Sequence, residues 1–293
     1  MHLGIDIGGS KVALRAESSD GAVRETSFRW SGASRRADDV RELTAHIEDM
    51  TGSRSRLRGV GIALPATVDA GGIVSAWPNR PWWTGLDLRA LLRDLFPATG
   101  ARFGDDGDLA AVAEAAAAGV RDAVYVGVGT GIGGGIVSGG RSLPGPDRGS
   151  CELGHVVVDR SGPPCACGRR GCLQAEASGP AVLRAAARTL GREVTYDELV
   201  RGRAAGAPWA CAALDHAAAV LATALVGAAE LVRPELLVVG GGFVAGLPGF
   251  VTGVADRVAE LARPGHPTPP VRPAALGGLS SLHGAVLAAR GLA

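Results

Sequence analysis

A chain of 293 residues with 30 basic and 29 acidic side chains has a net charge of only +1, which argues against a nucleic acid or an anionic membrane as partner. Hydrophobic residues make up 46% and charged residues 20%, which excludes a disordered chain and allows two domains. The first residues have no basic segment followed by an apolar one, and no uninterrupted apolar run predicts a membrane span, so we expect a cytoplasmic protein.

The predicted elements begin with an antiparallel meander, continue with alternating helices and strands, and end with a helix. Short apolar segments bounded by glycine, or long segments with helical composition, mark each element. Strands are expected over residues 3–7, 12–16, 22–29, 59–64, 123–128, 133–138 and 235–239, and helices over 38–50, 86–96, 106–119, 209–233 and 279–290. Residues 77–85 and 160–175 are expected to form loops.

A glycine-rich turn between two strands occurs twice, at residues 6–11 and 129–135, which predicts two similar halves with a cleft between them. Glycines let backbone N–H groups approach phosphate oxygens, and a carboxylate at a strand end can position Mg²⁺. The first turn contains Asp6 and Lys11, which is the only lysine in the chain. By itself this turn fits an ordinary hairpin equally well. The second turn has more glycines than a hairpin needs, which favours a ligand. A third cluster, Gly240–Gly242, follows a buried strand and could admit an adenosine.

A histidine and three cysteines are spaced as zinc ligands. They are His155, Cys165, Cys167 and Cys172. One imidazole and three thiolates form a closed tetrahedral set typical of structural Zn²⁺, and the alternative is a group of reduced thiols without metal.

Three carboxylates lie at the start of the predicted helix at 106–119. Asp105, Asp106 and Asp108 exceed the single aspartate that an N-cap requires. An ionised aspartate at this position could accept the proton of a hydroxyl that attacks a phosphoryl group.

Taken together, these motifs resemble the ROK family of sugar kinases and repressors. The resemblance rests on GVGTGIGGGIVSGG from residue 127, CELGHVVVD from 151, CACGRRGCL from 165 and ASG from 177, together with the first turn and the third glycine cluster. It implies an α/β, actin-like (hexokinase-type) fold, with ATP and Mg²⁺ between two domains. The domains are expected at 1–104, joined by the closing helix 279–293, and at 105–278 with the zinc loop. The resemblance also implies a homodimer.

The resemblance assigns roles to individual residues. Asp106 is expected to be the catalytic base. The phosphate and nucleotide contacts are Asp6, Gly8, Gly9, Lys11, Thr130, Gly131, Gly133, Gly240, Gly241 and Gly242. The acceptor contacts are Asn79, Asp105, Asp106, Glu152, His155 and Gln174, with His155 also a zinc ligand.

The chain departs from the family pattern at four places near the acceptor. The family has Pro-Gly at Pro65-Ala66, Asn-Asp at Asp105-Asp106, Ala-Gly-Glu at Ser150-Cys151-Glu152 and Cys-Leu-Glu at Cys172-Leu173-Gln174. We therefore expect an ATP-dependent kinase for a primary hydroxyl of a hexose or hexose-like polyol. The alternatives are a kinase for a C7-cyclitol (keto-carbasugar) of secondary metabolism, because Gln174 can donate a hydrogen bond where Glu cannot, and a non-catalytic sugar sensor. A DNA-binding repressor is disfavoured, because only five residues precede Asp6.

Overall fold

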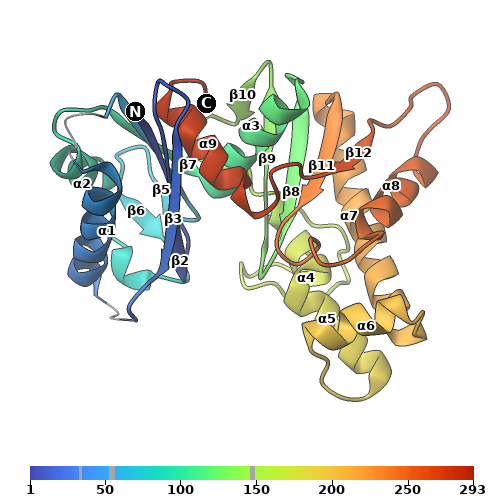
Figure 1. The fold of residues 1–293 in the computed structure, drawn as a ribbon. Helices are drawn as coiled ribbons and strands as arrows, with labels where there is room; N and C mark the ends of the chain where they lie inside the picture. The colour runs from blue at the N-terminus through green and yellow to red at the C-terminus, as the bar shows by residue number, and fades with distance from the viewer. Residues whose placement is uncertain (33–34, 53–56, 146–148) are drawn as a thin grey trace. The chain divides into compact units, whose positions relative to one another are not determined.

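The computed structural model describes residues 1–32, 35–52, 57–145 and 149–293. By their contacts these residues group into two compact units (Figure 1). Unit 1 comprises residues 1–113, 140–151 and 279–293, and unit 2 comprises 114–139 and 152–278. The domain boundary after residue 104 remains a prediction from the sequence, since contact grouping places 105–113 with unit 1.

The described residues form two five-stranded mixed sheets with the same strand plan, and the first of them lies in unit 1. In unit 1 the order is β3-β2-β1-β4-β7, and in the second sheet it is β10-β9-β8-β11-β12. The central strand β1 pairs antiparallel with β2 and parallel with β4. In the second sheet, β8 pairs in the same way with β9 and β11. The strands of the first sheet are β1 (His2–Ile7), β2 (Lys11–Glu17), β3 (Val23–Arg29), β4 (Gly59–Leu64) and β7 (Ala101–Asp105). Those of the second are β8 (Ala123–Val128), β9 (Ile132–Ser138), β10 (Arg141–Leu143), β11 (Leu236–Gly240) and β12 (Val271–Pro273).

The predicted meander and the predicted helices are present with small shifts at their ends. The helix expected from residue 86 begins at Leu88, because Asp87 caps it by accepting a hydrogen bond from the backbone N–H of Ala90 at 2.8 Å. The helices are α1 (Arg36–Thr51), α2 (Leu88–Leu95), α3 (Asp106–Ala118), α4 (Leu173–Ala177), α5 (Gly179–Leu190), α6 (Tyr196–Ala204), α7 (Pro208–Val232), α8 (Phe250–Glu260) and α9 (Ser280–Ala289). A hairpin of β5 (Thr67–Val68) and β6 (Val74–Ala76) and the 3₁₀ turns η2 (Pro81–Trp83), η3 (Leu153–His155) and η4 (Gly277–Leu279) complete the elements.

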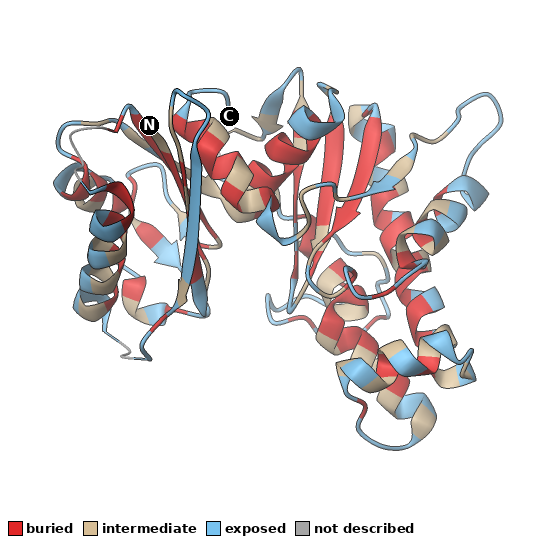
Figure 2. Ribbon diagram, viewed as in Figure 1, coloured by how far each residue is buried: buried red, intermediate tan, exposed pale blue. Residues whose placement is uncertain are grey.

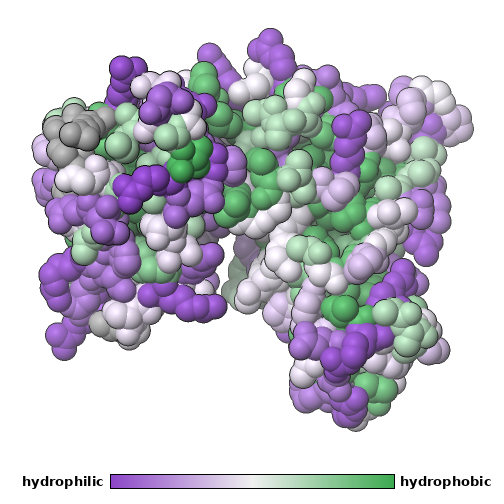
Figure 3. Space-filling view, in the orientation of Figure 1, coloured by the Kyte–Doolittle hydropathy of each residue, from purple (hydrophilic) through white to green (hydrophobic). Residues whose placement is uncertain are grey.

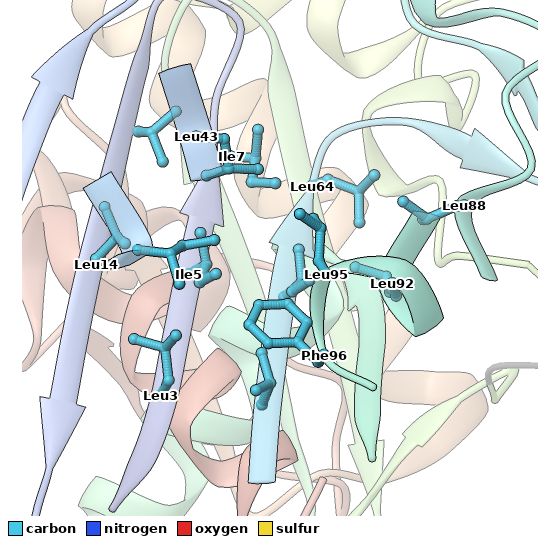
Figure 4. Packing of buried hydrophobic residues seen from close by; sticks show 14 of the residues in the cluster. Leu3, Ile5, Ile7, Leu14, Leu43, Leu64, Leu88, Leu92, Leu95 and Phe96 are labelled. Atoms are coloured by element: carbon cyan, nitrogen blue, oxygen red, sulfur yellow. The ribbon is translucent and has the colours of Figure 1, made fainter. Parts of the chain in front are cut away.

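The core of unit 1 lies on the face of its sheet that α1 and α2 cover (Figure 4). Apolar side chains alternate along β1 and β2, so that Leu3, Ile5 and Ile7 point to one side, as a half-buried strand requires. Outside this core, the surface over α1 is mainly hydrophilic (Figure 3). The packed β1 and β4 bring the first glycine-rich turn to a fixed position at the end of β1.

Helix α9 packs on the opposite side of the unit 1 sheet, against β1 and β4, although it comes last in the chain. Its approach is close because β4 carries glycine there. A Cβ added at Gly61 would lie 1.8 Å from the carbonyl oxygen of Ala285, so the helix backbone lies directly on the strand.

Strands β8 and β11 form the buried centre of unit 2, whereas β3 of unit 1 is largely exposed (Figure 2). Beside them runs α7, which is long and apolar enough to cross a membrane, yet half of its most apolar window is buried inside the fold. It packs against α4, α5, α6 and α8. These contacts explain the apolar composition of α7, which is typical of a core helix.

Candidate active site

The first glycine-rich turn joins β1 to β2 in unit 1. The N–H of Gly8 donates to the carbonyl of Lys11 at 2.9 Å, which closes the turn. Gly9 lies against the side chain of Asn79, since a Cβ added at Gly9 would be 2.6 Å from the Asn79 Cβ. The turn predicted to bind phosphate and the asparagine predicted to bind the acceptor are therefore neighbours, and the close approach explains why residue 9 is glycine.

Asp6 is the penultimate residue of β1, close to this turn. The hydroxyl of Ser281, at the start of α9, donates to Asp6 Oδ2 at 2.6 Å. Burial raises the pKa of Asp6, and the bond from Ser281 and the charge of Lys11 partly oppose that rise. A Mg²⁺ ion would suit this carboxylate, because a hard cation takes oxygen ligands and would stabilise the ionised form. Ser281 could not have been identified from the sequence, because it lies 275 residues away.

The three carboxylates at the start of α3 have separate partners. Asp105, the last residue of β7, accepts hydrogen bonds on Oδ1 from the N–H groups of Gly107 at 2.9 Å and Asp108 at 3.3 Å, so it caps the helix. Asp108 accepts a hydrogen bond from the N–H of Cys151 at 3.4 Å. The capping interpretation, considered for the cluster as a whole, thus applies to Asp105.

Asp106 has the perturbed acidity expected of a proton acceptor. Burial is the main cause, and the negative charges of Asp105 and Asp6 add to it, so the pKa rises from 3.8 to about 7. Hydrogen bonds from the backbone N–H groups of Gly107 and Asp106 itself oppose the rise. A carboxylate with a pKa near neutrality is both ionised at working pH and basic enough to take a hydroxyl proton.

A groove of about 920 Å³ in unit 1 adjoins this helix start. Asp105 and Asp108 line it, and so do two of the departures from the family pattern, Ala66 and Ser150. Its size is in the range of small-molecule sites. Some of the positions at which the chain departs from the family pattern therefore line this groove, whereas Gln174 and the predicted base Asp106 are not among its lining residues.

The second glycine-rich turn, between β8 and β9, lies in unit 2 with Thr130, Gly131 and Gly133. The carbonyl of Gly129 accepts a hydrogen bond from the N–H of Gly179 at 2.9 Å, at the start of α5. The third glycine cluster lies beside it. Gly241 has φ of +96°, and a Cβ there would be 2.4 Å from the backbone of Val128. The structure therefore brings together the predicted second phosphate turn and the predicted adenosine segment.

The four predicted zinc ligands converge in unit 2, with all their ligand atoms within 4.8 Å of one another. His155 Nδ1 lies 3.7 Å from Cys165 Sγ, and Cys167 Sγ lies 3.6 Å from Cys172 Sγ. Tetrahedral thiolates on zinc, with Zn–S bonds of about 2.3 Å, lie about 3.8 Å apart, so the donor set fits the ion.

The crowding of the thiols shifts the pKa values of Cys165 and Cys172 in opposite directions. Burial and the neighbouring Cys167 and Cys165 raise the pKa of Cys172 to about 12. Burial also raises the pKa of Cys165, but hydrogen bonds from the Cys167 backbone and from Gln174 outweigh it and bring that pKa to about 6. Without a cation Cys165 ionises readily and Cys172 does not, whereas a bound zinc would stabilise all of them as thiolates while fixing the loop.

Gln174 lies between this cluster and the second turn, not simply at an acceptor site. Its Nε2 donates to Cys165 Sγ at 3.5 Å, and its Oε1 is 3.2 Å from where a Cβ at Gly131 would be. The amide donor that the sequence assigned to a substrate carbonyl thus has a protein partner. Glu152 immediately precedes η3, and η3 ends at the predicted zinc ligand His155. The short η3 turn therefore holds these two predicted acceptor contacts, Glu152 and His155, close together.

Comparison with known proteins identifies the family. The model of the ROK family matches residues 2–291. The chain is 50% identical over 289 residues to the kanosamine kinase of Amycolatopsis mediterranei, covering 97% of this chain and 94% of the relative. A ROK hexokinase from Thermus thermophilus superimposes with a TM-score of 0.84 at 32% identity, covering 99% and 97% of the two chains. A ROK glucokinase from Streptomyces griseus, solved with glucose and AMPPNP, gives a TM-score of 0.79 at 25% identity, with 99% of each chain covered. The chain therefore belongs to the ROK family and is an ATP-dependent sugar kinase with the two-domain actin-like fold.

Proposed function

We propose that this kinase transfers the γ-phosphoryl group of ATP to a primary hydroxyl of an amino hexose of the kanosamine type, with Asp106 as general base. The observation that carries the assignment of the base is the half-buried Asp106 carboxylate at the N-terminus of α3, with its pKa raised to about 7. The acceptor class is supported by the 50% identity to a kanosamine kinase over nearly the whole chain.

In the proposed reaction the acceptor oxygen attacks the γ-phosphorus, and a new P–O bond forms as the bond to the β-phosphate oxygen breaks. The hydroxyl proton passes to an oxygen of Asp106, and ADP leaves with the electron pair of the broken bond. N–H groups of the first and second turns would hold the phosphates. Mg²⁺, held through Asp6, would neutralise phosphate charge. The roles of the turn residues follow from the family resemblance and are proposals for this chain.

Asp105 favours an amino sugar over a neutral acceptor. The family has asparagine at this position, whereas here a second carboxylate precedes the base. Its charge contributes to the raised pKa of Asp106, so it weakens the tendency of the base to ionise. A protonated amine on the acceptor would compensate for that charge when it binds, because opposite charges at close range favour the ionised forms. Neither glucose nor a cyclitol without an amine would offer this compensation.

A panel of acceptors tests the proposal by ADP release. We expect kcat/KM for kanosamine to exceed that for glucose by about tenfold or more, which is a modest difference for one charged contact. Asp105→Asn should reduce this preference while retaining glucose turnover, since asparagine also caps helices. Preference for a C7-cyclitol would instead support the alternative acceptor class. Equal use of glucose and kanosamine would contradict the amino-sugar proposal, and sugar binding without any turnover would indicate a sensor.

Three further proposals are tested separately: a zinc ion from the spacing of its ligands, a homodimer from the family resemblance, and a cytoplasmic location from the sequence. Metal analysis should find about one zinc per chain, held by the Cys₃His set. Sedimentation should give a homodimer, and fractionation of the producing cells should place the protein in the cytoplasm.

A further inference from the structure

A buried ion pair lies behind the first glycine-rich turn in unit 1. Arg80 Nη1 donates to Asp39 Oδ2 at 2.5 Å, and the two residues are 4% and 2% exposed. The indole N–H groups of Trp82 and Trp83 donate to the same Asp39 oxygen, at 2.8 and 2.7 Å. A buried pair of this kind is costly unless its groups are fully bonded, so its presence next to a predicted ligand turn calls for a role.

The pair holds the turn through carbonyl oxygens. Arg80 Nε donates to the carbonyl of Gly9 at 3.1 Å, and Trp30 Nε1 donates to the carbonyl of Gly8 at 3.0 Å. The Arg80 guanidinium also lies over the Trp30 ring, 4.1 Å from its centroid. These two side chains, from distant segments, therefore fix two successive peptide groups.

Fixing a carbonyl also directs the next N–H. A trans peptide is planar, so its N–H points opposite to its C=O. With the carbonyls of Gly8 and Gly9 drawn toward Trp30 and Arg80, the N–H groups of Gly9 and Ser10 point the other way. In the described part of the chain, neither N–H donates to a protein acceptor. Two adjacent, unused N–H groups aimed in one direction suit an anionic oxygen.

Arg80 itself is badly placed to be a phosphate ligand. Its Nε and Nη1 already donate to protein oxygens, its charge is matched by Asp39, and its side chain is 5% exposed. The neighbouring residue, Asn79, contacts Gly9 from the same short segment. The segment thus links the predicted acceptor contact to the turn, and Asp39 balances the charge of its Arg80.

We propose that Arg80, held by Asp39, and Trp30 are positioning residues that aim the N–H groups of Gly9 and Ser10 at a nucleotide phosphate. The inference rests on the assignment of this turn to the nucleotide in the proposed function. It does not depend on which sugar is the acceptor. Arg80 acts here through the Gly9 carbonyl and not by contact with substrate.

Three substitutions separate positioning from simple stability. Arg80→Lys keeps the charge beside Asp39 but loses the planar fork that reaches both partners. Trp30→Phe keeps a ring under the guanidinium and removes only the donor to Gly8. Trp82→Phe is the matched control, because it removes a donor to the same Asp39 oxygen and leaves both tethers of the turn intact.

The primary readout is titration of each folded variant with Mg²⁺-ADP and with Mg²⁺-AMPPNP, alongside the thermal midpoint. We expect Arg80→Lys to weaken nucleotide binding by about 10-fold to 100-fold and Trp30→Phe by about 3-fold to 10-fold, in line with lost hydrogen bonds to a charged and a neutral donor. Trp82→Phe should bind within about twofold of the wild type even if its thermal midpoint falls. In turnover, KM for ATP should rise more than KM for the sugar.

The inference is overturned if Arg80→Lys and Trp30→Phe bind nucleotide as the wild type does, or if Trp82→Phe loses as much affinity as they do. Should Arg80→Lys fail to fold, Trp30→Phe against Trp82→Phe decides the question. Wild-type protein that binds nucleotide but does not phosphorylate amino sugars would contradict the proposed function alone, and the titrations would still test the positioning role.

Discussion

Replacing Asp106 with asparagine should abolish turnover and at the same time stabilise the protein at pH 8. The folded state raises the pKa of this carboxyl from 3.8 to about 7, chiefly by burial. Between these two values the unfolded chain has lost the proton that the folded chain still holds, so wild-type stability falls as the pH rises from about 4 to 7. A rise of about three in the pKa corresponds to roughly 4 kcal/mol in the free energy of unfolding. Asparagine, which never ionises, does not have this penalty.

The assay is denaturant unfolding of wild type and Asp106→Asn at a series of pH values, with ADP release measured on the same preparations. We expect the two proteins to be nearly equally stable at pH 4, with the variant more stable by a few kcal/mol at pH 8. A stability gain that does not change with pH, or a variant that is less stable at pH 8, would refute the attribution of the pKa shift to the folded site. Turnover that survives near the wild-type rate would refute the role as base.

Three other predictions follow from particular contacts. The acid limb of kcat/KM should fall about tenfold per pH unit below about pH 7, since the base must be ionised. Asp105→Asn should move that limb to lower pH by removing a neighbouring charge, and a limb that stays in place would contradict this cause. Removing zinc with a chelator should expose residues 160–171 to proteolysis and raise KM for the sugar more than KM for ATP, and an unchanged digestion pattern would argue against a structural metal. Gly61→Ala should destabilise by about 3 kcal/mol or more because the new methyl meets the α9 backbone, whereas Gly253→Ala, in open space on α8, should be neutral or slightly stabilising in thermal unfolding.

Elements with strong local signals could be predicted from the sequence. The meander from β1 to β3 has apolar segments separated by turn residues, and α3 combines acidic residues at its start with an alanine-rich body. Strand β7 was missed because its five residues include an exposed arginine and a glycine and carry no alternating pattern. It forms through pairing with β4, which is a tertiary effect that local propensity does not contain.

The motifs indicated which residues gather at the site but not what each side chain touches. The position of Asp105 before α3 was consistent with both capping and substrate contact, and only the structure assigns it two backbone donors. The hypothesis for Gln174 treated its donor as free for a substrate, whereas it reaches Cys165. Arg80 and Asp39 are 41 residues apart, and neither gives a local sign that it is buried with an opposite charge. Sequence patterns therefore do not predict polar partners that lie far apart in the chain.

The repeated glycine-rich turn also differs between the two units in how it is held. In the first turn, the carbonyls of Gly8 and Gly9 accept hydrogen bonds from the side chains of Trp30 and Arg80. In the second, the carbonyl of Gly129 accepts one from the backbone N–H of Gly179, and the carbonyl of Val128 accepts one from that of Phe243. A backbone donor is present whatever the side chain, whereas an indole or guanidinium donor is lost by a single substitution. A single side-chain truncation can therefore remove a tether of the first turn, whereas it cannot remove the backbone donors that hold the second. For this reason, the positioning role is best tested at Trp30 and Arg80.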